Sequence, residues 1–150
     1  MQKVEGIRWL SFDQLSLNEL YSILKLRSDI FVVEQVCAYP DLDNLDQKSY
    51  HGLLYQADQL TGYIRIYQTD SGQWTFGRVV VNPAYRKQKL GTYLVKGALD
   101  KIKELHKNAT IIIGAQAHLE SYYQQFGFIT LSEPYDDYGI LHVDMRLESS

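Results

Sequence analysis

The stretch from Arg86 to Thr92 places basic side chains and a glycine where an apolar segment gives way to an amphipathic one. It reads Arg86-Lys87-Gln88-Lys89-Leu90-Gly91-Thr92. Free backbone N–H groups at the start of a helix bind anions, and the helix dipole strengthens that binding. The dipole by itself favours acidic side chains at this end, so the basic ones indicate an anionic ligand. The alternative is a solvated basic turn, and the loop alone leaves both interpretations open.

Other phosphate-binding patterns do not fit this loop. A Walker loop needs G-x-x-x-x-G-K-[S/T], which the sequence lacks. A dinucleotide fingerprint needs three glycines at the first strand–helix junction, whereas Gly91 stands alone. The anion expected here is therefore bound in another way.

Metal chemistry is not expected either. The carboxylates of Asp41, Asp43 and Asp46 suggest a calcium loop, but Asp46 and Gly52 stand where an EF-hand needs glycine and glutamate. The single cysteine, Cys37, excludes a multi-cysteine zinc site. The acidic segment then has two open interpretations: it attracts a cationic amine, or it is simply solvated.

The first half of the chain predicts a strand, a helix and a three-stranded meander. The strand is expected at 7–12, and Ser16 with Glu19 forms a capping box that begins the helix. Three strands at 51–56, 62–67 and 74–81, separated by short polar turns, predict the antiparallel meander. The expected apolar face of the helix consists of Leu17, Leu20, Tyr21, Leu24 and Phe31.

The second half predicts a helix at 90–106, a buried strand at 109–115, a short helix at 118–126 and final strands at 128–132 and 140–147. The order is β-α-βββ-α-β-α-ββ. A strand–helix–strand unit in the middle requires a parallel pair, so we expect an α/β fold with a mixed, mostly antiparallel sheet flanked by helices. We see no linker and expect one domain over residues 1–150. The apolar face of the long helix should consist of Leu90, Leu94, Ala98, Ile102 and Leu105.

Composition excludes several classes of protein. Of the 150 residues, 45% are hydrophobic and 22% are charged, as in ordinary globular domains and unlike disordered chains. The formal net charge of −3 offers no broad basic surface, so nucleic acid is not an expected partner. No apolar run approaches the ~18 residues of a membrane helix, and the first residues lack the apolar core of a signal peptide. We expect a soluble, cytoplasmic protein without a membrane partner.

Two motifs resemble those of the GCN5-related N-acetyltransferase (GNAT) superfamily. The basic loop is similar to its pyrophosphate-binding pattern [Q/R]-x-x-G-x-[G/A], with Arg86 first, Gly91 last and Lys89 in place of the middle glycine. The segment from Tyr123 to Phe128 resembles the family's Y-x-x-x-G-F signature. The loop also follows the third strand of a meander and precedes a long helix, as the family requires.

Further blocks resemble the ElaA-like subfamily, and the resemblance spans about residues 7–147. It departs at Leu141, where proline is expected. The blocks are Leu26-Arg27 with residues 31–35, residues 39–43, Gly77-Arg78-Val79 and residues 114–119.

The resemblance implies acetyl-CoA as the cosubstrate. Its pantetheine arm would pair with the strand backbone at Val79, Val80 and Val81, and an N–H near Val81 would stabilise the oxyanion. Its pyrophosphate would lie on Arg86 and on the backbone amides from Lys87 to Thr92, which include those of Gln88, Lys89, Leu90 and Gly91. Gln116 matches the position of a polar side chain that holds the cofactor.

The resemblance also implies catalytic roles. Tyr123 matches the tyrosine that protonates the leaving thiolate, although it also lies on an apolar helix face and could simply pack there. His118 and Glu34 are the candidates for the general base. For His118 the alternative is a capping or packing role, and for Glu34 a solvated charge at a helix end. Arg27 interrupts an apolar helix face, so we expect it to pair with a carboxylate inside the protein.

The function implied is acetyl transfer from acetyl-CoA to a primary amine by direct attack in a ternary complex. The acceptor is a small molecule or a peptide. The alternative is a non-catalytic module that binds acyl-CoA and senses it or regulates a partner. A homodimer is compatible with the aromatic content and the C-terminal strands.

Overall fold

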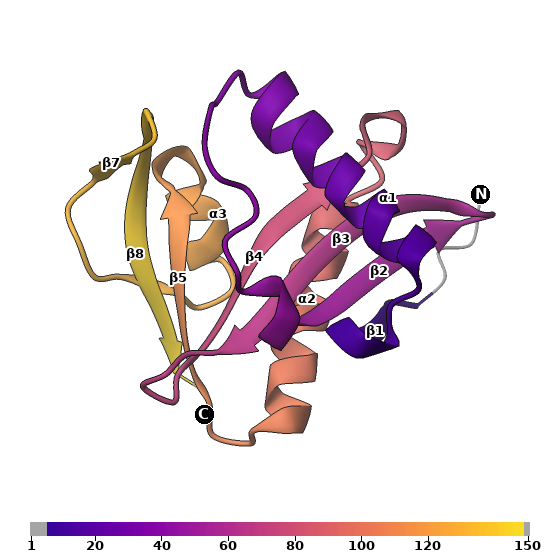
Figure 1. Cartoon of the computed structure of the whole chain (residues 1–150). Coiled ribbons are helices and arrows are strands. Elements are labelled where there is room, and N and C mark those ends of the chain that lie inside the picture. Colours follow the sequence, from indigo (N-terminus) through magenta and orange to yellow (C-terminus); the bar gives the residue numbers. More distant parts are fainter. Residues whose placement is uncertain (1–5, 149–150) are drawn as a thin grey trace.

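The computed structural model describes residues 6–148, through which a single eight-stranded sheet runs (Figure 1). The strands are β1 (Arg8–Ser11), β2 (Tyr50–Gln56), β3 (Gln59–Gln68), β4 (Trp74–Val81), β5 (Thr110–Gln116), β6 (Ile129–Thr130), β7 (Tyr135–Asp137) and β8 (Ile140–Glu148). They follow the order β1-β2-β3-β4-β5-β8-β6, and β7 pairs with β8 outside this path. β4 and β5 are parallel, and the other pairs of the described residues are antiparallel. The expected mixed sheet is confirmed.

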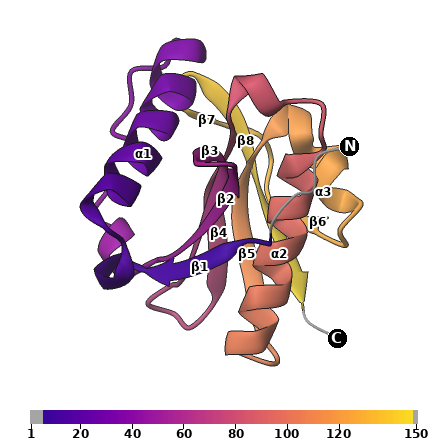
Figure 2. The same ribbon diagram turned by 90° about the vertical axis from the view of Figure 1, so that its right-hand side faces the viewer.

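Helices cover both faces of this sheet, with α1 on one face and α2 and α3 on the other (Figure 2). The α-helices are α1 (Leu17–Arg27), α2 (Leu90–Leu105) and α3 (Glu120–Gln124). A π-helix, η2 (Ser28–Glu34), continues α1, and short 3₁₀ turns are η1 (Phe12–Gln14), η3 (Asp46–Lys48), η4 (Pro83–Tyr85) and η5 (Ala117–Leu119). The expected element order is confirmed, with β7 added to it. None of the helices in residues 6–148 is long and apolar enough to cross a membrane.

The apolar face predicted for the first helix is wrong at Leu17 and Tyr21, whereas Leu20, Leu24 and Phe31 are half-buried and Phe31 packs against the core. Leu17 and Tyr21 are 87% and 70% exposed, and the buried stripe consists instead of Ile23, Leu26 and Ile30. Arg27 lies on the same stripe and is fully buried. Because its guanidinium must reach carboxylates inside the protein, the helix is rotated so that the neighbours of Arg27 face the sheet.

The apolar face predicted for α2 is confirmed except at its end. Leu94, Ala98 and Ile102 have no exposed surface, and Leu90 is 2% exposed. Leu105 is 38% exposed because it is the last residue of the helix. The start of α2, which directly follows the basic loop, is therefore held in place by the core between α2, α3 and the sheet.

β4 and β5 touch at one end only. Their parallel pairing is limited to Trp74 and Ile111, near the start of each strand. From there the two strands diverge towards their carboxyl ends, and no other strand fills the space between them (Figure 1). Among residues 6–148, the second half of β4 therefore has no strand partner on this edge.

A β-bulge in β4 accompanies this divergence. The β3–β4 register passes from Tyr63–Val80 to Arg65–Gly77, so β4 contains one extra residue. Arg78, at the bulge, has a φ of 53°. A bulge bends its strand and increases the local twist, which directs the second half of β4 away from β5.

Candidate active site

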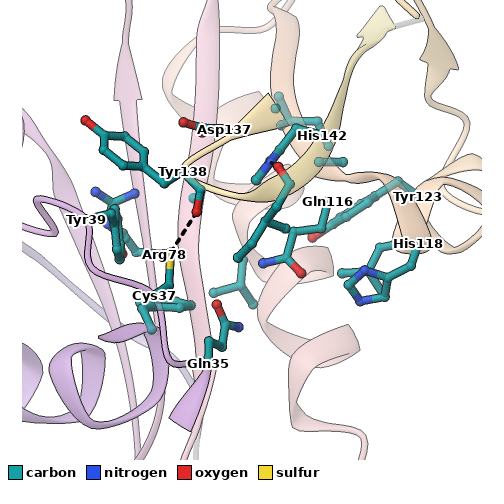
Figure 3. Close-up of a pocket in the computed structure, with 18 of the residues that line it drawn as sticks. Gln35, Cys37, Tyr39, Arg78, Gln116, His118, Tyr123, Asp137, Tyr138 and His142 are labelled. Carbon is teal, nitrogen blue, oxygen red and sulfur yellow. Dashed lines mark hydrogen bonds between the residues drawn. The ribbon is translucent and has the colours of Figure 1, made fainter. Parts of the chain in front are cut away.

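A cavity of about 370 Å³ occupies the gap between β4 and β5 (Figure 3). Residues 76–79 of β4 and 113–116 of β5 form two of its walls. The remaining lining comes from η2 and the segment after it, from η5 and α3, and from the turn between β7 and β8. Residues far apart in the sequence, from Phe31 to His142, therefore meet at this one place.

The basic loop lies at the start of α2 and leaves its helix terminus open. Lys89 is the N-cap residue and makes no side-chain capping bond, so the first backbone N–H groups of α2 are not satisfied in that way. Lys87 and Lys89 have φ values of 78° and 58°, which lie in the left-handed region. Glycine adopts this region without strain, which explains the glycine of the family motif at the position of Lys89. A Cβ added at Gly91 would meet no atom within 4 Å, so the surface beside it is open. An anion fits here.

Glu34 and Arg86 bind each other. The Arg86 Nη2 donates to Glu34 Oε1 at 2.6 Å, and both side chains are 44% exposed. Glu34 is not among the residues that line the cavity. The structure thus brings a candidate base to the candidate pyrophosphate loop and away from the cavity.

Two further polar side chains of the loop region also have partners. Gln88 accepts a hydrogen bond from Gln56 Nε2 at 2.9 Å. Thr92 Oγ1 lies 2.8 Å from the hydroxyl of Tyr122. These contacts tie the start of α2 to β2 and to α3.

The backbone of β4 offers free hydrogen-bonding groups to the gap. Asn82 N–H donates to Thr61 O at 2.7 Å, and alternation along an antiparallel pair then turns the main-chain groups of Val81 and Val79 away from β3. Val79 lines the cavity, whereas the side chain of Val80 is buried against the α1 side of the sheet. An extended ligand with amide groups fits along this edge.

Tyr123 combines a packed ring with a free hydroxyl. Its ring centroid lies 6.1 Å from those of Phe76 and Phe128 and 5.1 Å from that of Tyr122. The residue is 8% exposed and lines the cavity, into which the hydroxyl points (Figure 3). Among residues 6–148 this hydroxyl has no hydrogen-bond partner. Burial, with a smaller contribution from Tyr122, raises the pKa of Tyr123 to about 12, so at neutral pH the phenol keeps its proton.

Three polar residues from β5, η5 and β8 complete the lining. Gln116 ends β5, and His118 follows in η5 as an exposed side chain. His142 lies opposite Gln116 in the β5–β8 register and is half-buried. The sequence alone gives His142 no role, because no spacing relates it to the other polar residues. Only the pairing of β5 with β8 brings it to the cavity.

The acidic segment is neutralised by arginines. Its partners are Arg27, Arg65 and Arg78, which bind Asp41, Asp43 and Asp46. Arg27 Nη1 donates to Asp46 Oδ1 at 2.7 Å, and Arg27 Nε to Asp41 Oδ2 at 3.0 Å. The expected internal pairing of Arg27 is confirmed. Both interpretations of the segment, an attractor of cations and a solvated loop, are wrong, because its charges are paired and largely buried.

The pKa of Asp43 reflects this pairing. Burial opposes ionisation of the carboxyl group, but the hydrogen bonds and charge of Arg65 outweigh it and lower the pKa of Asp43 to about 2. Burial opposes ionisation of Asp46 too, and Arg27 and Arg65 lower its pKa.

No group of three or more His, Cys, Asp or Glu side chains in residues 6–148 is arranged to hold a metal ion.

The network holds one wall of the cavity in place. Arg78 lies at the bulge of β4, 2.8 Å from Asp41 and 5.3 Å from the ring centroid of Tyr39. Cys37 is buried, and its Sγ donates to Tyr138 O at 3.3 Å. Tyr39 and Arg78 both bind Asp41 and line the cavity beside Cys37, so the network positions these two side chains without contributing a free charge.

The fold and the site define an acyltransferase. The protein-family model of the acetyltransferase (GNAT) domain matches residues 31–149 of the sequence. Escherichia coli ElaA is 38% identical over 148 residues, which cover 95% of this chain and 97% of ElaA. The chain therefore belongs to the GNAT acetyltransferase family. Within that family it lies in the ElaA-like subfamily.

Solved structures agree with this assignment. An acyl-CoA N-acyltransferase from Pseudomonas aeruginosa superposes with a TM-score of 0.91 at 36% identity, over 96% of this chain and 99% of that one. E. coli ElaA gives a TM-score of 0.89 at 36% identity, with coverage of 96% and 99%. A Bacillus subtilis acetyltransferase solved in complex with CoA shares the fold, with a TM-score of 0.68 at 22% identity and coverage of 97% and 99%.

Proposed function

We propose that the protein transfers an acetyl group from acetyl-CoA to a primary amine by direct attack in a ternary complex. The observation that carries the proposal is the gap between β4 and β5. Around one cavity lie a strand edge and the hydroxyl of Tyr123, neither of which has a partner within residues 6–148. Membership of the GNAT family supports the class of reaction.

The cofactor site has three parts, each of which fits a different portion of acetyl-CoA. The open helix start at Lys89 and the uncovered Gly91 fit the pyrophosphate. The free main-chain groups of Val79 and Val81 fit the two amides of the pantetheine arm. Gln116 lines the cavity, and its polar side chain would hold the part of the cofactor that enters it.

Tyr123 is the proposed general acid. A thiolate is a poor leaving group unless it takes a proton, and a positioned acid contributes roughly 10²–10⁴-fold to such a step. With a pKa raised to about 12, Tyr123 stays protonated until charge develops on the sulfur. Its ring packing holds the hydroxyl at one place in the cavity.

The acceptor in this proposal is a small-molecule or peptide amine. The proposal also places the protein in the cytoplasm, where the thiol of Cys37 stays reduced.

A panel of amines tests the proposal. Each amine is mixed with acetyl-CoA and the purified protein, and release of free CoA thiol is monitored. Turnover with at least one amine, lost in the Tyr123→Phe variant, supports acetyl transfer. Tight binding of acetyl-CoA in a calorimeter without turnover of any amine would favour the non-catalytic acyl-CoA-binding module instead.

A further inference from the structure

We propose that His142 is the general base that takes the proton from the amine acceptor, an assignment that rests on the proposed function. His142 lies near the start of β8, is half-buried and lines the cavity. The amine needs such a base, because an ammonium ion has no lone pair for attack.

A backbone hydrogen bond fixes the tautomer of His142. Its Nδ1 lies 2.8 Å from the carbonyl oxygen of Ile140. A carbonyl oxygen only accepts hydrogen bonds, so Nδ1 carries the proton, and the lone pair of the neutral ring is on Nε2. No group of residues 6–148 forms a hydrogen bond with Nε2. The basic nitrogen is therefore available to a ligand.

The ring is also held in orientation. It stacks on Tyr135, with the ring centroids 6.2 Å apart and an angle of 26° between the planes. Tyr135 is the neighbour of His142 in the β7–β8 register, and its hydroxyl donates to Asp144 Oδ1 at 2.6 Å. A base held in one tautomer and one orientation loses little freedom when it acts.

The sheet separates this base from the proposed acid. His142 is the register partner of Gln116, and the next pair, Val143 with Ala115, is buried in the core that also contains Tyr123. Successive side chains of a strand point to opposite faces, so His142 and Tyr123 line the cavity from opposite faces of the sheet. Figure 3 shows His142 beside the β7–β8 turn and Tyr123 on the far side of Gln116. An amine bound on the side of His142 would lie near the base, and a thioester sulfur on the side of Tyr123 would lie near the acid.

The two candidate bases expected from the sequence, Glu34 and His118, each lack either the place in the cavity lining or the fixed ring that His142 has. Glu34 is paired with Arg86 and does not line the cavity. His118 lines the cavity, but Figure 3 shows it beside Tyr123, and no hydrogen bond within residues 6–148 fixes its ring. His118 is therefore the competing candidate, and its variant is compared with those of His142.

The protons balance in this scheme. His142 Nε2 takes one proton from the ammonium group, and the nitrogen then forms its bond to the acyl carbon. Tyr123 donates a proton to the sulfur as the C–S bond breaks. The second proton of the nitrogen restores Tyr123, and His142 releases its proton to solvent. Each turnover yields an amide, a thiol and one free proton.

Two variants of His142 separate base chemistry from structure. His142→Asn keeps an N–H donor at the position of Nδ1 for Ile140 O but has no basic nitrogen. His142→Gln places an amide near the position of Nε2 and serves if the first variant does not fold. Thermal unfolding and calorimetric binding of acetyl-CoA are measured for both variants and for His118→Gln.

We expect kcat to fall by about 10²-fold or more in both His142 variants, whereas the affinity for acetyl-CoA stays within about threefold of wild type. We expect kcat to fall less in His118→Gln than in either His142 variant. Nitrogen NMR of histidine-labelled protein should show His142 with a protonated Nδ1 and an unprotonated Nε2.

Three results would overturn the assignment: normal kcat in a folded His142 variant, a larger loss in His118→Gln, or a proton on Nε2 of the neutral ring. Wild-type protein that turns over no amine would instead overturn the proposed function, and the role of His142 with it.

Discussion

Glu34 and Arg86 join the end of η2 to the loop before α2 through an ion pair of 2.6 Å. The pair connects a segment beside the cavity with the open helix start. A phosphate group bound at that helix start would compete with Glu34 for the same guanidinium.

Removing the charge of Glu34 should therefore strengthen cofactor binding. Both side chains are 44% exposed, and an exposed pair contributes up to about 1 kcal/mol, so we expect Glu34→Gln to lower the dissociation constant of acetyl-CoA by about two- to fivefold. Calorimetry at low and high salt measures the effect, which should shrink as salt screens the charges. Weaker binding in Glu34→Gln would mean that the pair shapes the loop for the cofactor.

Gly91 should be essential for cofactor binding but not for folding. A Cβ at this position meets no atom of the protein within 4 Å, so Gly91→Val should fold, and valine is a better helix former than glycine. The new side chain would keep a phosphate from the backbone amides, and we expect acetyl-CoA to bind at least about tenfold more weakly. Gly91→Ala should give a smaller loss. Unchanged affinity in folded Gly91→Val would place the pyrophosphate elsewhere.

Tyr123→Phe should lose turnover and keep stability. The hydroxyl has no partner within the described chain, whereas the ring packs against aromatic neighbours, so phenylalanine preserves the contacts. We expect kcat to fall by roughly 10²–10⁴-fold with little change in KM, provided that chemistry limits the rate. Tyr123→Ala should also lower the free energy of unfolding, by about 3–5 kcal/mol. A fully active Tyr123→Phe protein would leave only the packing role.

Arg27 should be important for stability. It is fully buried between Asp41 and Asp46, and removal of one partner from a buried ion pair costs about 3–5 kcal/mol because it leaves the other charge uncompensated. Urea unfolding of Arg27→Met measures this loss. Arg8→Met is the control, since Arg8 is 56% exposed in its pair with Glu19 and should change stability by less than about 1 kcal/mol.

The same network predicts sensitivity to acid. Arginine partners lower the pKa of Asp43 to about 2, below its ordinary value of 3.8, so its contribution to stability is present above pH 4. The contribution is lost as the pH falls from about 4 to about 2, because the unfolded state binds the proton first. Thermal unfolding between pH 6 and pH 2 should show a shallower decline for Asp43→Asn than for wild type. Asp58→Asn, at an exposed turn, should follow the wild-type curve.

Local patterns predicted several elements well. β4 spans Trp74–Val81 and α2 begins at Leu90, as expected, because Asn82-Pro83 ends the strand and a clear apolar period begins the helix. The sequence did not predict β7, because its three residues are all exposed and only its pairing with β8 defines it as a strand. The sequence did not predict the π-helix η2 either, since its residues continue the apolar pattern of α1.

The sequence by itself determined the family, the element order and the position of the basic loop, because each depends on residues close together in the chain. Which face of α1 is buried, and which charges neutralise the acidic segment, depended on arginines at 27, 65 and 78 that reach it from three different elements. Only the tertiary structure brought His142 beside Gln116 and joined Glu34 to Arg86. Side chains that meet through strand pairing or helix packing leave no periodic signal, so their chemistry is decided by the fold.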